Sequence, residues 1–148
     1  PLQRGLEKSS RSLSDLDIQV GGSLEISEDV ERLIEARRPA MAFTLGGMGS
    51  AQTNFYNDAF SRAGYETEAK KVQSLWVDGK KEEAIRAVPA EMVLKTNLIG
   101  TREMVIERIR AYAAVGVTTL RVSSTGTNWK ERTESLAEAT DLVHSISV

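Results

Sequence analysis

Residues 94–124 read LKTNLIGTREMVIERIRAYAAVGVTTLRVSS. Gly100 and Thr101 open an amphipathic segment, and Gly116 closes it. The apolar, β-branched run 117–122 follows directly, so the stretch predicts a helix over 102–115 that leads into a strand. A helix that feeds a strand is the repeating half-unit of parallel α/β folds. The sequence therefore predicts an α/β protein.

A second strand is predicted over residues 16–26, where apolar and polar residues alternate strictly. Residues 27–116 lie between the two predicted strands, although a parallel crossover needs only about a dozen residues. Most of that connection is therefore expected to be a helical insertion, which makes the chain mostly helical. Two strands do not complete a parallel sheet, so we expect the chain to be the C-terminal part of a larger fold.

The expected organisation starts with a loose lead-in over 1–15, followed by a portion over 16–148. That portion comprises the strand 16–26, the helical insertion 27–100 and a closing helix–strand–helix unit over 101–148. The first insertion helix is expected to start at the N-cap Ser27, with a kink or a break at Pro39. Further helices are expected over 65–77, over 81–88 and from Pro89. The last helix is expected to turn one apolar face inward, formed by Trp129, Leu136, Ala139, Val143 and Ile146.

Composition excludes several classes of function. Acidic and basic residues are mixed, the net charge is −2, and there is no basic stripe for nucleic acid. No apolar run is long enough to span a membrane, which favours a cytoplasmic location. The sequence has no cysteine, and His144 is its single histidine, so we expect no metal site and no thiol or histidine triad from this chain alone.

The motifs resemble a known family. In order, they are Leu45-Gly46-Gly47-Met48-Gly49-Ser50, Asn54-Phe55-Tyr56-Asn57, Gly64-Tyr65, Gly79-Lys80-Lys81-Glu82-Glu83-Ala84, Val88-Pro89, Leu98-Ile99-Gly100 and Ala114-Val115-Gly116-Val117-Thr118-Thr119-Leu120. This succession resembles the C-terminal part of luciferase-like oxidoreductases, especially the group that uses the 8-hydroxy-5-deazaflavin coenzyme F420. The resemblance covers roughly residues 16–145.

The resemblance implies a (β/α)8 TIM barrel, with the two predicted strands as its seventh and eighth. It also implies hydride transfer between the deazaflavin of coenzyme F420 and an organic substrate, with most of the coenzyme held by strands outside this chain. The chain alone is therefore not expected to bind the coenzyme tightly or to turn over substrate. A related alternative is FMN as cofactor, with monooxygenation as the reaction.

Two groups of residues are candidates for coenzyme or substrate binding. The first is the glycine cluster Gly46, Gly47, Met48, Gly49 and Ser50. It could form a backbone nest or a tight wall against a ligand, or simply a helix end with close packing. Nearby, Asn54, Tyr56, Asn57 and Asp58 are expected either to contact substrate as a lid or to form a loop packed by Phe55 and Phe60.

The second group follows the last strand and comprises Ser123, Ser124, Thr125 and Gly126. Hydroxyls, a glycine and free amides before a helix suit an oxyanion, but Thr127 or Asn128 could equally cap that helix. Arg121 is a candidate anion contact if it points into a barrel; otherwise it lies under a helix beside a carboxylate. No carboxylate pair stands out as general acid and base, so the catalytic residues stay unassigned.

The sequence leaves two classes of function open. The first is part of an enzyme that acts on a small-molecule substrate. The second is a non-catalytic helical module that oligomerises or docks to another chain, because exposed strand edges invite pairing. The expected macromolecular partner is either a second copy of the chain or the missing N-terminal portion of the barrel.

Overall fold

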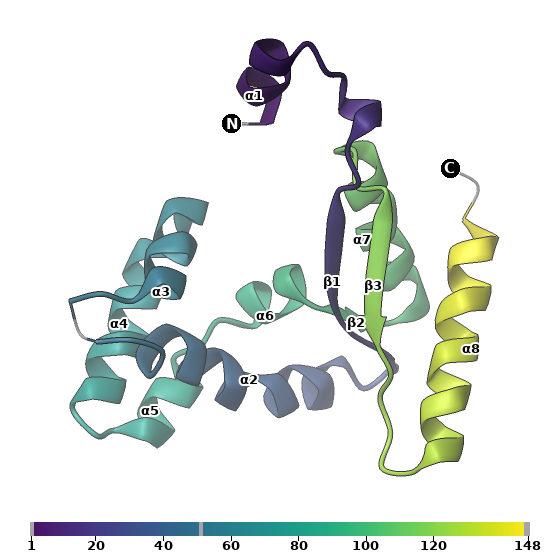
Figure 1. The fold of residues 1–148 in the computed structure, drawn as a ribbon. Coiled ribbons are helices and arrows are strands. Elements are labelled where there is room, and N and C mark those ends of the chain that lie inside the picture. The colour runs from purple at the N-terminus through teal and green to yellow at the C-terminus, as the bar shows by residue number, and fades with distance from the viewer. Residues whose placement is uncertain (1, 51, 147–148) are drawn as a thin grey trace. The chain divides into compact units, whose positions relative to one another are not determined.

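The computed structural model describes residues 2–50 and 52–146. Its elements are α1 (Leu2–Ser9), the 3-10 turn η1 (Leu13–Asp15), β1 (Gln19–Ile26), α2 (Val30–Gly46), α3 (Phe55–Phe60), the π-helical turn η2 (Ser61–Tyr65), α4 (Glu66–Val77), α5 (Lys81–Arg86), α6 (Ala90–Thr96), β2 (Leu98–Gly100), α7 (Arg102–Ala114), β3 (Thr119–Ser123) and α8 (Trp129–Ser145) (Figure 1). Two compact units result. The stretches up to Ser27 and from Asn97 onward form the first unit, and Glu28–Thr96 form the second.

Three strands form the sheet of the first unit, in the order β2-β1-β3. Strand β1 pairs in parallel with β2 from Leu24↔Leu98 to Ile26↔Gly100, and with β3 from Gln19↔Thr119 to Ser23↔Ser123. The expectation of two strands is therefore wrong, because it missed β2. That strand has three residues, all buried, and so short an apolar run carries no periodicity.

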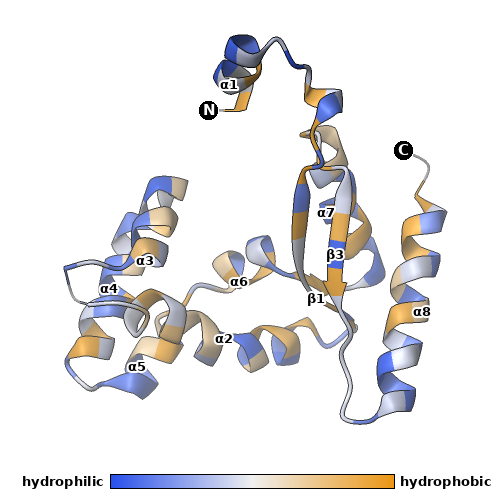
Figure 2. Cartoon of the chain, in the orientation of Figure 1, coloured by the Kyte–Doolittle hydropathy of each residue, from blue (hydrophilic) through white to orange (hydrophobic). Residues whose placement is uncertain are grey.

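The two faces of the sheet carry different side chains. Leu24, Leu120 and Val122 lie on one face and pack with α7 and α8 in an apolar core. The buried members of this core are Leu24, Leu98, Val105, Ile109, Ala139, Leu142 and Ile146. In Figure 1, α7 lies behind the two long strands, and Figure 2 shows apolar and polar bands alternating along β3. Because side chains alternate along a strand, Gln19, Gly21, Ser23, Thr119, Arg121 and Ser123 lie on the opposite face.

Helix α7 agrees with the sequence prediction. Thr101 is its N-cap and accepts a hydrogen bond from the backbone N–H of Met104, and Val105 and Ile109 are buried. Gly116, just past its end, has φ +90°, the left-handed conformation that a glycine adopts at little cost.

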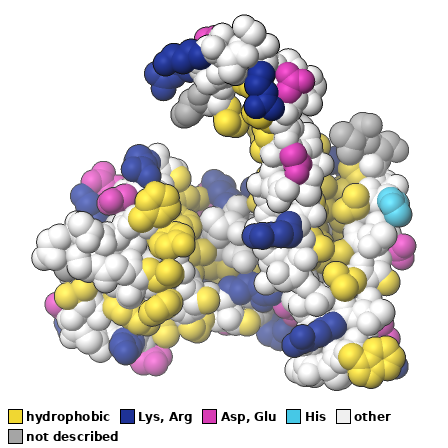
Figure 3. Space-filling model, viewed as in Figure 1, with side chains coloured by type: hydrophobic (Ala, Val, Ile, Leu, Met, Phe, Trp, Pro, Cys, Tyr) yellow, Lys and Arg dark blue, Asp and Glu magenta, His cyan; other side chains and the backbone are white. Residues whose placement is uncertain are grey.

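Helix α8 departs from the prediction in the face that it buries. The buried residues are Ala139, Leu142 and Ile146, whereas Trp129 is 79% exposed, Leu136 44% and Val143 42%. The sheet thus covers only part of the apolar surface of α8. Leu136 and Val143 line an open cavity of about 270 Å³ together with Leu120 and Val122 of β3, and Figure 3 shows hydrophobic side chains between the strands and α8.

Residues 2–9 also correct the sequence analysis, which expected a loose lead-in. They form α1, and Leu6 on this helix is 5% exposed. None of the helices in the described part of the chain combines the length and the apolar character that a membrane crossing requires.

The second unit is a cluster of helices, α2 to α6, around its own apolar core. Helix α2 starts later than expected, because the chain stays extended through Ser27, whose N–H donates to the Gly100 carbonyl 2.9 Å away. Asp29 is therefore the N-cap, and its side chain accepts from the Arg32 N–H at 3.0 Å. Of the kink or break expected at Pro39, the break does not occur, because α2 runs as one helix to Gly46. Pro39 and Glu35 are both exposed, so water can satisfy the carbonyl that Pro39 leaves without a donor.

Two adjacent glycines of β1 provide a matched test of the sheet. A Cβ built on Gly21 would lie 2.3 Å from the Arg121 carbonyl oxygen, whereas one built on Gly22 meets nothing within 4 Å. We expect Gly21→Ala to force β1 and β3 apart and to lower the free energy of unfolding by about 1–3 kcal/mol. Gly22→Ala should leave that free energy unchanged or raise it by up to about 1 kcal/mol. Urea unfolding followed by circular dichroism measures both, and equal midpoints for the two variants would contradict this packing.

Candidate functional site

The carboxyl ends of the three parallel strands meet at one edge of the sheet, where ligands bind in parallel α/β folds. An open groove of about 930 Å³ lies there. Strand β1 contributes Glu25 and Ile26, and α7 contributes Arg102. The remaining lining comes from the loop after β3 and from α8: Thr125, Gly126, Thr127, Glu131, Glu134, Ser135, Glu138 and Asp141.

This groove is acidic. Five carboxylates line it, against the single guanidinium of Arg102. Four of the five come from α8 at positions 131, 134, 138 and 141, a spacing that places them along one side of a helix. The negative charges of these carboxylates repel an incoming anion. The groove itself therefore favours neutral or cationic groups over phosphate.

The loop after β3 uses its donors within the chain. The side chain of Glu131 accepts from the Thr127 N–H at 2.6 Å and from the Thr127 hydroxyl at 2.9 Å. Asn128 is the N-cap of α8, and its Oδ1 accepts from the Glu131 N–H at 3.0 Å. The bonds to the Glu131 carboxylate, led by that from the Thr127 backbone, lower the pKa of Glu131 below its ordinary value of 4.5. A carboxylate of the chain thus occupies both donors of Thr127 in this loop.

The four candidates of this loop differ in what they contact. Thr125 is tied to its surroundings, because its hydroxyl donates to the Leu24 carbonyl at 3.3 Å and its N–H donates to the Ser135 hydroxyl at 3.2 Å. Gly126 lines the acidic groove with Thr125. Ser123 ends β3 and is exposed, and Ser124 is half-buried beside it. Their assignment to ligand binding stays a prediction.

The orientation of Arg121, which the sequence left open, is decided by the strand pairing. Arg121 is exposed on the sheet face opposite Leu120 and Val122, away from the core of α7 and α8. Its partner in the register is Gly21, which has no side chain to cover it. Arg121 therefore does not lie under a helix of this core.

The glycine cluster Gly46–Ser50 belongs to the second unit and ends α2. A Cβ on Gly46 would lie 2.4 Å from Cβ of Trp76, and one on Gly47 would lie 2.6 Å from the Phe43 ring. Gly49 has φ +112°, and a Cβ there would meet the Thr53 carbonyl oxygen at 2.3 Å. Close packing and a sharp turn within the chain thus account for all three glycines, while a ligand contact of the cluster stays a prediction.

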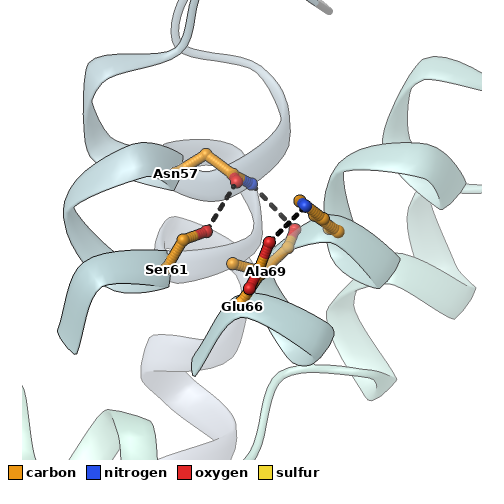
Figure 4. Close-up of polar contacts among 5 residues, drawn as sticks. Asn57, Ser61, Glu66 and Ala69 are labelled. Carbon is orange, nitrogen blue, oxygen red and sulfur yellow. Dashed lines mark hydrogen bonds and ion pairs between the residues drawn. The ribbon is translucent and has the colours of Figure 1, made fainter. Parts of the chain in front are cut away.

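Two buried asparagines complete this helix end. Asn54 donates through Nδ2 to the Leu45 carbonyl at 2.8 Å, and Asn57 donates through Nδ2 to the carbonyls of Leu45 at 3.0 Å and Ala69 at 2.8 Å. Figure 4 shows Asn57 between Ser61 and Ala69. The expected loop is instead the short helix α3, with Phe55 72% exposed rather than packed inward. A side-chain amide suits this place because Leu45 lies in the last turn of α2, where carbonyls have no backbone donor within the helix.

Sequence reasoning missed the acidic side of α8, although its spacing was visible in the sequence. Of the two N-cap candidates, Thr127 and Asn128, the structure confirms Asn128. Sequence reasoning missed Glu131, whose position three residues after the N-cap is a capping signal. Within residues 2–50 and 52–146, no three or more His, Cys, Asp or Glu side chains are grouped so that they could hold a metal ion. The two groups of predicted site residues lie in different units: Gly46–Ser50 in the second, and Arg121 with Ser123–Gly126 in the first.

Comparison with known proteins gives one family and two informative relatives. The model of the luciferase-like monooxygenase family matches residues 2–119. A Mycobacterium tuberculosis protein, named as a putative coenzyme F420-dependent oxidoreductase, is 31% identical over 114 residues, which cover 77% of this chain and 33% of the relative. The 5,10-methylenetetrahydromethanopterin reductase of Methanopyrus kandleri is 27% identical over 124 residues, covering 83% of this chain and 34% of that enzyme. The chain spans about a third of the length of these relatives.

The Glu131 cap predicts a pH dependence. Because the pKa of Glu131 is lowered in the folded state, its carboxylate stabilises the fold above pH 4.5, and this contribution is lost as the pH falls through the lowered pKa. The difference in unfolding free energy between the wild type and Glu131→Gln should therefore be constant above about pH 5 and shrink in stronger acid. Urea unfolding between about pH 3 and pH 7, roughly the range in which carboxyl groups titrate, measures it. Glu138→Gln is the control on the same helix, and an identical acid profile for both variants would contradict the cap.

Removal of the Asn57 side chain tests the end of α2. Asn57→Ala leaves two buried carbonyls without this donor, so we expect a loss of about 1–3 kcal/mol in unfolding free energy. The adjacent, exposed Asp58 supplies the control, since Asp58→Ala should cost less than about 0.5 kcal/mol. Thermal and urea unfolding report both values. A loss for Asn57→Ala no larger than the control would show that the hydrogen bonds contribute nothing.

Proposed function

Because this chain belongs to the luciferase-like monooxygenase family, we propose that it forms part of an oxidoreductase that transfers a hydride between coenzyme F420 and an organic substrate. The observation that carries the proposal is the family match over residues 2–119, about four-fifths of the chain. The names of the two relatives support it, since one is described as a coenzyme F420-dependent oxidoreductase and the other as a reductase.

The family has a TIM-barrel fold, in which eight parallel strands close with helices outside. The observed unit is consistent with a part of such a barrel, because its strands are parallel and α7 and α8 cover one face. We propose that β1 and β3 are the seventh and eighth strands of the barrel and that the other barrel strands lie outside this chain. The two strands pair directly and in parallel, as neighbouring strands of a barrel do. The three-residue strand β2 pairs only with the last three residues of β1, beyond the part that pairs with β3.

The residues of this chain do not by themselves fit a bound deazaflavin. The groove at the carboxyl ends of the strands is open and lined by five carboxylates, so it neither encloses a planar ring nor attracts an anionic group. The activity is accordingly proposed for the complete barrel, and we expect this chain alone to bind coenzyme F420 weakly. Luciferase-like proteins that use FMN are the alternative within the same family, with monooxygenation as the reaction.

A coenzyme titration tests the proposal. The protein to use is the longer polypeptide that joins this chain to the remaining barrel strands, with the 148-residue chain as the matched control. We expect the longer protein to bind coenzyme F420 with at least about tenfold higher affinity than FMN, a difference of about 1.4 kcal/mol. The 148-residue chain should bind neither measurably. The fluorescence of each cofactor reports binding.

Two results of this titration would contradict the proposal. Preference for FMN in the longer protein would replace the deazaflavin proposal with the monooxygenase alternative. No affinity for either cofactor would refute the oxidoreductase proposal and would favour a non-catalytic module. Sedimentation of the 148-residue chain then tests the homo-oligomer that such a module requires.

A further inference from the structure

We propose that Arg121, Ser23 and Ser123 form a binding site for an oxyanion, a phosphate or carboxylate group, on the polar face of the sheet. The inference rests on the proposed function, because a barrel with α7 and α8 outside turns this face toward its interior. It adds a ligand class and a place that the family match does not give.

The strand register brings the three side chains together. Gly21 pairs with Arg121, and Ser23 pairs with Ser123. Side chains of paired residues lie on the same face, and residues two apart along a strand share it. The two serines thus form the next row after Arg121 toward the carboxyl ends of the strands, which is the end where parallel barrels carry their sites.

Gly21 keeps the neighbourhood of Arg121 open. A Cβ at position 21 would lie 2.3 Å from the Arg121 carbonyl oxygen and 3.0 Å from the Arg121 Cβ. The strands are therefore as close here as a glycine permits, and no side chain stands beside the base of Arg121 on β1. The guanidinium is left accessible on the face of the sheet.

The donors of this cluster are unused within the described chain. Among residues 2–50 and 52–146, neither the Arg121 guanidinium nor the Ser23 and Ser123 hydroxyls has a hydrogen-bond or ion-pair partner. The amino ends of the same strands show the contrast. There the Asp17 carboxylate accepts from the hydroxyls of Thr118 at 2.7 Å and Thr119 at 2.6 Å.

The chemistry of the cluster selects an anion. A guanidinium offers several N–H donors and no acceptor, and its planar fork matches two oxygens of a carboxylate or phosphate. The serine hydroxyls can donate to a further oxygen. Glu25 lies one row beyond the serines on β1 and lines the acidic groove. The guanidinium of Arg121 is therefore the group of this cluster that favours an anion.

Variants of the longer polypeptide test the site. Arg121→Gln should weaken the binding of coenzyme F420 by about tenfold to a hundredfold, because a charged hydrogen-bonding partner is lost. Arg121→Lys keeps the charge without the fork, so its affinity should lie between those of the wild type and of Arg121→Gln. Arg110→Gln is the matched control, since Arg110 is an exposed arginine of α7. It should leave the affinity unchanged.

Two sources of the oxyanion are separated by the same variants. If the anion belongs to the coenzyme, Arg121→Gln weakens the binding of the coenzyme. If it belongs to the substrate, coenzyme affinity stays, while the binding of inorganic phosphate to the coenzyme-loaded longer polypeptide is lost in Arg121→Gln. Retention of both by Arg121→Gln would overturn the site.

A second measurement keeps this test independent of the proposed function. Inorganic phosphate is titrated into the isotope-labelled 148-residue chain, and the Arg121 side-chain NMR signal is followed against that of Arg110. A saturable shift confined to Arg121 and lost in the double variant Ser23→Ala, Ser123→Ala supports the site even if the longer protein binds no coenzyme. Equal, unsaturated shifts of both arginines would overturn it.

Discussion

Parallel hydrogen bonding on both edges of β1 is the constraint on which the first unit depends. Strand β1 pairs with β2 through its last three residues and with β3 through its first five, so neither neighbour is attached to the sheet without it. Leu24 lies at the centre of this arrangement and is 1% exposed. Full burial of a leucine side chain contributes about 1.5–3 kcal/mol, and here it joins the sheet to α7 and α8 in one core.

Because side chains alternate along β1 and β3, the sheet has one apolar face and one polar face. The face with Leu24, Leu120 and Val122 stabilises the unit, because it packs against α7 and α8 in the apolar core. The other face carries polar residues that contribute little to the core, and it leaves Arg121 exposed. A parallel sheet is ordinarily covered on both sides. The polar face adds little to the core, and it carries the oxyanion site that we propose.

The most recognisable motif of the chain has a structural explanation of its own. Gly46 lets α2 approach Trp76 of α4, and Gly47 leaves room for the Phe43 ring in the last turn of α2. Asn54 and Asn57 donate to the Leu45 carbonyl at the end of α2. These glycines and asparagines are therefore explained by the way in which α2 ends. The acidic row of α8 and the Glu131 cap, by contrast, shape the groove although they belong to none of the family-like motifs.

Elements with local sequence signals were predicted from the sequence. Thr101 and Gly116 delimit α7, and the alternation over 16–26 indicates β1. The family model matches residues 2–119, a range that includes the glycine and asparagine motifs. Only the tertiary structure revealed β2, decided which side of α8 is buried, and placed Arg121 on the open face. The physical reason is that caps and periodicity depend on residues within a few positions. Strand order, strand face and burial depend on partners about a hundred residues away along the chain, such as Ile18 and Thr118.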